Sequence, residues 1–126
     1  MVIKMDLARS TSEKLNQIIQ ADCLTELERL EERSIHLTIF SPPYDGIRDY
    51  KSNWGFNFHA LGEQLFRITK DGGVPVVVIG DGTKDFAKSL TSFRLAVDWC
   101  DAIGWRLFET CIYKRDGNPG AWWNSR

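Results

Sequence analysis

Four consecutive residues, Ser41, Pro42, Pro43 and Tyr44, directly follow an apolar run of the chain. Proline fixes its own φ angle and restricts the residue before it, so the backbone here is rigid. The Ser41 hydroxyl and the Pro42 carbonyl are hydrogen-bond acceptors, and the Tyr44 ring offers a flat surface for stacking. These residue types, in this order, suit the binding of an amine attached to an aromatic ring.

Such an amine is a poor nucleophile, because its lone pair is delocalised into the ring. Acceptors that are fixed before the reaction would hold both N–H groups and favour a nitrogen with a localised lone pair. With a sulfonium methyl donor no strong base is required, since the proton leaves after the nitrogen has become cationic. For the proline pair alone, closure of a turn is the alternative interpretation.

The composition predicts one ordinary globular domain. The chain has 126 residues, of which 43% are hydrophobic and 26% charged, with a net charge of −1. It has no apolar run near the ~20 residues that span a bilayer and no signal-peptide pattern at its start, so we expect a cytoplasmic protein without membrane contact. The three cysteines and two histidines are not spaced as metal ligands, and no metal site is predicted.

Hydrophobic periodicity predicts strands that alternate with helices. The strands are expected at 15–22, 34–40, 74–82 and 105–115, and the helices at 23–32, 56–70 and 86–104. The Asp-Gly-Gly segment at 71–73 is expected to end the second helix, with glycine as the left-handed cap. This order predicts an α/β fold with a mostly parallel sheet of about four strands flanked by helices.

Ligands of parallel sheets bind at the carboxyl ends of the strands. Asp22, the segment from Ser41 to Tyr44, and Asp81 all fall at such ends. For Asp22 the alternative is an N-cap of the following helix, and for Asp81 a turn residue. The layout therefore places these residues together as candidates for one site.

The Ser-Pro-Pro-Tyr motif after an apolar strand resembles motif IV of the S-adenosylmethionine-dependent DNA amino methyltransferases. The similarity extends over about 15–115, through "ADCLTELERLEERSIHLTIFSPPYD" and "LFRITKDGGVPVVVIGDGT". It implies a partial Rossmann-like methyltransferase sheet and methylation of an exocyclic amine of DNA. The serine form of the motif favours N4 of cytosine, with N6 of adenine as the alternative.

The resemblance also implies roles for single residues. Ser41 and the Pro42 carbonyl would accept the hydrogens of the target amine, and Pro43 would fix the turn. Tyr44 would stack on a base flipped out of the duplex. Asp22 would lie near the adenine of S-adenosylmethionine, and Asp81 would lie beside the site at the end of the central strand. Both are therefore candidate cofactor-binding residues.

One family feature is missing from the sequence. The Phe-x-Gly-x-Gly loop that binds the methionine end of the cofactor does not occur, and the motif order is similar to the first half of the permuted β subclass. We therefore expect a fragment, or a chain whose second subunit supplies the glycine half, with weak or no cofactor binding and no activity alone. The expected parts are an arm at 1–14, a partial catalytic domain at 15–115 and the start of a loop or recognition segment at 116–126.

Three further expectations follow. The open sheet edge of a partial domain favours a homodimer. Methylation of RNA or of a protein glutamine is a less suitable function, since such enzymes commonly carry Asn-Pro-Pro-Tyr. A non-enzymatic nucleic-acid-binding module is an alternative based on Arg115, Trp122, Trp123 and Arg126, although the two tryptophans are also typical core residues.

Overall fold

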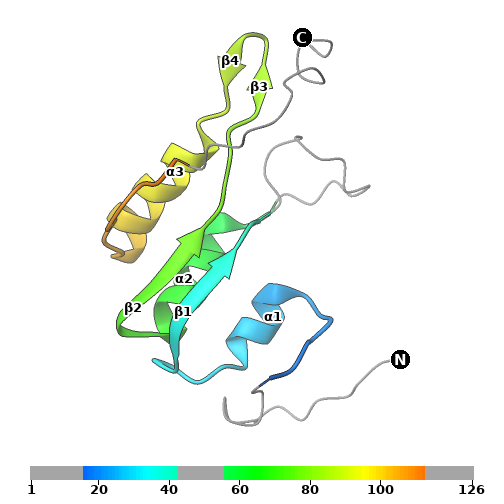
Figure 1. The fold of residues 1–126 in the computed structure, drawn as a ribbon, viewed down its shortest axis with the longest axis vertical. Coiled ribbons are helices and arrows are strands. Elements are labelled where there is room, and N and C mark those ends of the chain that lie inside the picture. The colour runs from blue at the N-terminus through cyan, green and yellow to red at the C-terminus, as the bar shows by residue number, and fades with distance from the viewer. Residues whose placement is uncertain (1–15, 43–55, 113–126) are drawn as a thin grey trace.

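The computed structural model describes residues 16–42 and 56–112 (Figure 1). The predicted arm at 1–14 and the predicted segment at 116–126 lie outside these residues. The elements in chain order are α1 (Cys23–Glu28), β1 (Ile35–Phe40), α2 (Phe58–Ile68), β2 (Thr69–Val77), β3 (Thr83–Lys84), β4 (Ala87–Lys88), α3 (Thr91–Asp98) and the π-helical turn η2 (Trp99–Ile103). The protein thus combines helices and strands, as the sequence predicts.

The centre of the fold is a parallel pair of strands, β1 and β2, joined by the crossover helix α2. Leu37 pairs with Val74 and Phe40 with Val77, so the carboxyl ends of both strands lie at the same edge. β1 begins where the β-branched run was predicted. Hydrophobic, β-branched residues suit such a strand because their side chains pack against cross-strand neighbours.

A bulge interrupts this pairing near the start of β2. Ile35 pairs with Thr69 and Leu37 with Val74, so an advance of two residues in β1 matches an advance of five in β2. Gly72 has φ 78° within the bulge, a conformation that glycine adopts without steric cost. The predicted glycine cap of α2 is therefore wrong: the helix ends at Ile68, Thr69 is already extended, and Gly72 serves the bulge instead.

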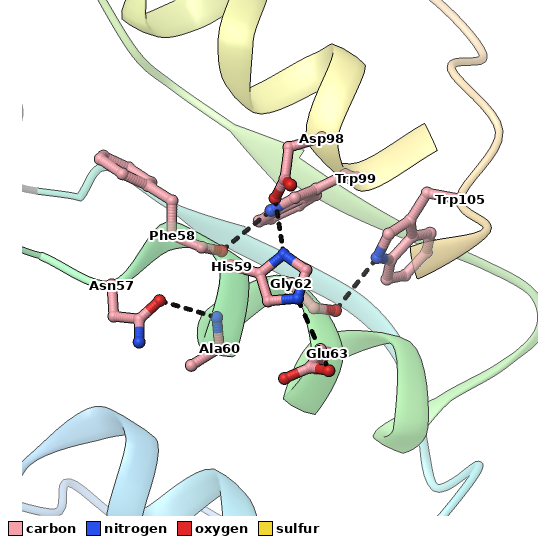
Figure 2. A network of polar contacts seen from close by, with 9 residues as sticks. All are labelled: Asn57, Phe58, His59, Ala60, Gly62, Glu63, Asp98, Trp99 and Trp105. Carbon is pink, nitrogen blue, oxygen red and sulfur yellow. Dashed lines mark hydrogen bonds and ion pairs between the residues drawn. The ribbon is translucent and has the colours of Figure 1, made fainter. Parts of the chain in front are cut away.

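The core lies between α2 and the segment that contains α3 and η2. It consists of Leu61, Leu65 and Ile68 from the apolar stripe of α2, together with Trp99 from η2. The indole N–H of Trp99 donates to the carbonyl of Phe58 at 2.9 Å (Figure 2). This hydrogen bond fixes the orientation of the Trp99 ring, against which the three aliphatic side chains of the core pack.

A long side chain connects α1 to α2. The guanidinium of Arg67 donates from Nη2 to the carbonyl of Leu27 at 2.8 Å and from Nη1 to that of Leu30 at 2.9 Å. Carbonyls at a helix carboxyl end have no partner within the helix, and a cation there is favourable. Arg67 therefore adds long-range hydrogen bonds to a helix end that the N–H groups of Arg29 and Leu30 already cap locally.

Only one face of the β1–β2 sheet is covered among the described residues. α2 lies behind the two strands in Figure 1, and Phe40 and Val77 pack toward the core. The opposite face carries apolar side chains that are 39–65% exposed: Leu37, Ile39, Val74, Val76 and Val78. Parallel sheets normally have both faces buried, so this surface is unusual.

Two of the predicted strands are absent from the described segments. Residues 16–22 and 105–112 adopt no strand, and the parallel sheet has two strands where about four were predicted. Two of their apolar side chains are almost fully exposed: Ile18 is 104% exposed and Phe108 is 93% exposed. A strand requires a neighbouring strand for its backbone hydrogen bonds, and alternation of apolar residues cannot supply one.

The third helix begins later than predicted. Residues 83–88 form the antiparallel hairpin β3–β4, and its turn residues Asp85 and Phe86 have φ 51° and 61°. Leu90 also has a left-handed backbone, with φ 58°, and the helix starts only at Thr91. Because these positive φ angles are incompatible with a right-handed helix, the predicted start at residue 86 is wrong. The predicted end is confirmed, with Gly104 at φ 103° as the cap.

Candidate functional site

Ser41 and Pro42 lie directly beyond β1, at the carboxyl edge of the parallel pair. The N–H of Val78 donates to the carbonyl of Phe40 at 2.9 Å, so pairing continues to the last residue of β1. Ser41 is exposed and Pro42 is buried. The motif thus begins at the strand end where the sequence places it. Pro43 and Tyr44 lie outside the described residues, as do the aromatic and basic residues proposed for a nucleic-acid-binding module.

A pocket of about 660 Å³ opens beside this strand end. Its lining residues come from α1, β1, α2 and adjoining segments: Asn16, Ile19, Ala21, Cys23, Glu26, Leu27, Leu30, Ile35, Thr38, Phe40, Ser41, Pro42, Phe56, Leu61 and Leu65. Most of these side chains are apolar, and the few polar ones include the hydroxyls of Thr38 and Ser41. Small-molecule sites typically have this volume and this composition.

Asp22 acts as the N-cap of α1. The backbone N–H of Thr25 donates to Asp22 Oδ1 at 3.1 Å, and the Thr25 hydroxyl donates to the same oxygen at 3.3 Å. The interpretation of Asp22 as a helix cap is therefore confirmed. Asp22 is not among the residues that line the pocket, although Ala21 and Cys23 on either side of it are.

Asp81 also stabilises a helix start, although it is far from that helix in sequence. The backbone N–H of Ser92 donates to Asp81 Oδ1 at 2.9 Å, and the Ser92 hydroxyl donates to Oδ2 at 2.8 Å. The N-cap residue of α3, Leu90, makes no side-chain cap, so Asp81 takes that role. The Ser92 backbone hydrogen bond is the main cause that lowers the pKa of the Asp81 carboxyl below its ordinary value. Asp81 does not line the pocket.

A polar cluster around His59, which the sequence did not predict, joins the first turn of α2 to the end of α3. His59 Nδ1 lies 2.9 Å from Asp98 Oδ2, and Nε2 lies 3.7 Å from Glu63 Oε1 (Figure 2). The hydrogen bond to Asp98 is the largest cause that raises the pKa of the imidazole above 6.5. The spacing of His59 and Glu63, one helical turn apart, is visible in the sequence, whereas the contact with Asp98 depends on the tertiary fold.

This cluster predicts a pH-dependent stability. The pKa of His59 is raised in the folded state, so the protonated imidazole stabilises the fold. This contribution is complete below about pH 6.5, the pKa of histidine in the unfolded chain. It is lost as the pH rises through the pKa of His59 in the folded state. We expect the melting temperature to fall over that range in the unaltered chain, and the fall to be smaller in His59→Gln. Thermal unfolding followed by circular dichroism across the neutral range measures both. An identical pH dependence in the two proteins would contradict the assignment.

The described ranges, 16–42 and 56–112, contain neither a candidate metal site nor a membrane-spanning helix. No cluster of three or more histidine, cysteine, aspartate or glutamate side chains there could hold a metal ion. Within the same residues, none of the helices is both long and apolar enough to cross a membrane.

Comparison with known proteins found one informative similarity. The chain is 40% identical over 89 residues to a protein named orphan methyltransferase M.BamHII from Bacillus amyloliquefaciens. The alignment covers 71% of this chain and 33% of the relative, so the chain spans about a third of the relative's length. No protein-family model matches the sequence, and no solved structure matches it.

Proposed function

We propose that this chain carries the part of a methyltransferase that binds the target amine. The observation that carries the proposal is the position of Ser41 and Pro42, at the carboxyl end of a parallel strand and in the wall of a pocket. Similarity to a protein named as a methyltransferase supports it. The reaction proposed is methyl transfer from S-adenosylmethionine to an exocyclic amine of DNA, with N4 of cytosine favoured by Ser41.

In this function the chain's own residues hold and orient the amine. The Ser41 hydroxyl and the Pro42 carbonyl accept its two N–H groups, and buried Pro42 limits movement of that backbone. Tyr44 stacks on the base after it has turned out of the duplex. S-adenosylmethionine, when bound, would supply the methyl group, and the role of this chain's residues would be to hold the amine nitrogen in place for the transfer.

The described residues do not complete a site for the methyl donor. The carboxylates of Asp22 and Asp81, the residues proposed to lie near it, accept hydrogen bonds at the starts of α1 and α3. Gly80 and Gly82 precede the hairpin β3–β4, so they do not form a glycine-rich turn at a helix N-terminus. We therefore propose that the chain alone binds S-adenosylmethionine weakly or not at all, and that a glycine-rich part from elsewhere completes the enzyme.

Replacement of Ser41 tests the proposal in a chimera. The aligned segment of this chain would replace the matching 89 residues of the Bacillus relative. Methyl transfer from labelled S-adenosylmethionine to DNA would then be measured. We expect Ser41→Ala to lower the rate by on the order of 100-fold, because one fixed partner of the reacting amine is lost.

Ser34→Ala is the matched control, because Ser34 lies before β1, at the opposite end from Ser41, and donates to the carbonyl of Glu31. It should leave the rate nearly unchanged. A Ser41→Ala chimera that keeps the unaltered rate would disprove the role of this hydroxyl. Nucleoside analysis of the product distinguishes N4-methylcytosine from N6-methyladenine, the alternative product.

A further inference from the structure

The outward face of α3 and η2 is an apolar surface with charges at both ends. The inward side of this segment packs Leu95, Trp99 and Ile103 on the core. On the outward side Phe93 is 65% exposed and Val97 is 59% exposed. Together with neighbouring residues they line a shallow groove of about 470 Å³. Apolar residues on two opposite sides of a helix are typical of a helix that packs against other protein surfaces on both sides.

The charged residues of this groove have opposite signs at its two ends. Arg94 lies near the start of α3, and Asp101 lies in η2, about two helical turns further on. Neither side chain forms an ion pair with any other residue in the described ranges. The groove therefore offers one cation and one anion on either side of an apolar centre.

We infer that this face binds the same face of a second copy of the chain. An antiparallel arrangement about a twofold axis beside Val97 brings Arg94 of each copy to Asp101 of the partner subunit. The same axis places the large Phe93 ring over the small Ala102 of the partner subunit. A twofold interface requires a surface that is complementary to itself, and the reversed charges along this groove meet that requirement.

The remaining charge near the axis does not oppose this arrangement. Asp98 also lines the groove, and two copies would bring two such carboxylates close together. Each of them is paired with His59 of its own chain at 2.9 Å. The pairing offsets the repulsion between the two Asp98 side chains.

The open face of the β1–β2 sheet is a less suitable dimer interface. Its exposed residues are all apolar, from Leu37 to Val78, and provide no charges that would fix one orientation of two copies. Charge complementarity gives an interface its specificity and register. The groove on α3 and η2 has that property, and its small size indicates a weak, reversible dimer.

Charge reversal and charge exchange test this inference on the full chain of 126 residues. Sedimentation equilibrium would give the dimer dissociation constant. Arg94→Asp replaces two attractive contacts by two repulsive ones, and we expect it to raise that constant at least about 10-fold. The double variant Arg94→Asp with Asp101→Arg restores opposite charges and should return the constant to within a few-fold of its original value.

Two control variants separate this interface from others. Arg106→Asp changes the net charge as Arg94→Asp does, at an exposed position outside the groove, and should leave the constant unchanged. Ile39→Lys alters the open sheet face and should also leave it unchanged. Circular dichroism checks that each variant is folded.

Four results would overturn the inference. The first is a chain that stays monomeric at concentrations on the order of 100 µM, where even a weak dimer forms. The second is an Arg94→Asp variant that dimerises as well as the unaltered chain. The third is a double variant whose dimer dissociation constant stays as high as that of Arg94→Asp. The fourth is dissociation by Ile39→Lys, which would place the dimer interface on the sheet instead.

Discussion

Replacement of Gly62 by alanine is expected to destabilise the protein strongly, although the same change usually stabilises a helix. Alanine is favoured over glycine in helix interiors by about 1 kcal/mol. Here the added Cβ would lie 2.6 Å from Trp99 Cε2 and 2.7 Å from Ile103 Cδ1, and would also contact Trp99 Nε1. The indole cannot turn away without breaking its hydrogen bond to Phe58. We expect a net loss of about 3 kcal/mol in the free energy of unfolding, measured by urea denaturation.

Gly72→Ala is the matched control for this prediction. At Gly72 a Cβ would meet nothing within 4 Å, but the backbone has φ 78°. The expected loss is about 1 kcal/mol, from the left-handed conformation alone. If Gly62→Ala were as stable as the unaltered protein, the close packing of α2 against Trp99 would be incorrect.

The second large effect is expected from Trp99→Ala. Trp99 is 5% exposed and is the largest residue of the core, where it packs near Leu61, Leu65 and Ile68. Truncation of a buried aromatic side chain to alanine costs about 3–5 kcal/mol, which is a large part of the stability of a small domain. We expect the far-ultraviolet circular dichroism of Trp99→Ala to show a largely unfolded chain at moderate temperature.

Trp105→Ala is the control, because Trp105 stands next to the same core. Its ring stacks with that of Trp99 at 6.1 Å, and its indole N–H donates to the carbonyl of Gly62 at 3.1 Å. Since Trp105 is only partly buried, its loss should cost clearly less than that of Trp99. Equal losses for the two variants would mean that the core is not centred on Trp99.

The elements that were predicted correctly have hydrophobic patterns that depend only on residues close together in the sequence. The leucines at 24, 27 and 30 follow a helical spacing, and α1 contains the first two of them. The apolar stripe of α2 and the β-branched run of β1 likewise appear near their predicted positions. The position of Ser41 at a strand end followed from these elements, because the boundary of β1 is marked by the motif itself.

The features that the sequence did not predict depend on residues far apart in the chain. Asp81 caps a helix start through Ser92, 11 residues later, and the partner of His59 is Asp98, 39 residues later. The alternating residues of 105–112 satisfy the strand pattern, but no described strand lies beside them to form a ladder. Periodicity reports which side chains favour burial, whereas the partner that buries or caps them is set by the tertiary fold.

The contact of Arg67 with α1 has a consequence for the order of folding. A helix of six residues, such as α1, is well below the ~12–15 residues at which isolated helices begin to persist in water. Besides its local caps, its carboxyl end and the turn after it accept hydrogen bonds from Arg67 that span 40 and 37 residues of the chain. α1 therefore forms and opens together with α2, as one cooperative unit. Because α1 provides one wall of the pocket beside Ser41, the pocket exists only after this long-range closure, and any ligand bound there stabilises both helices at once.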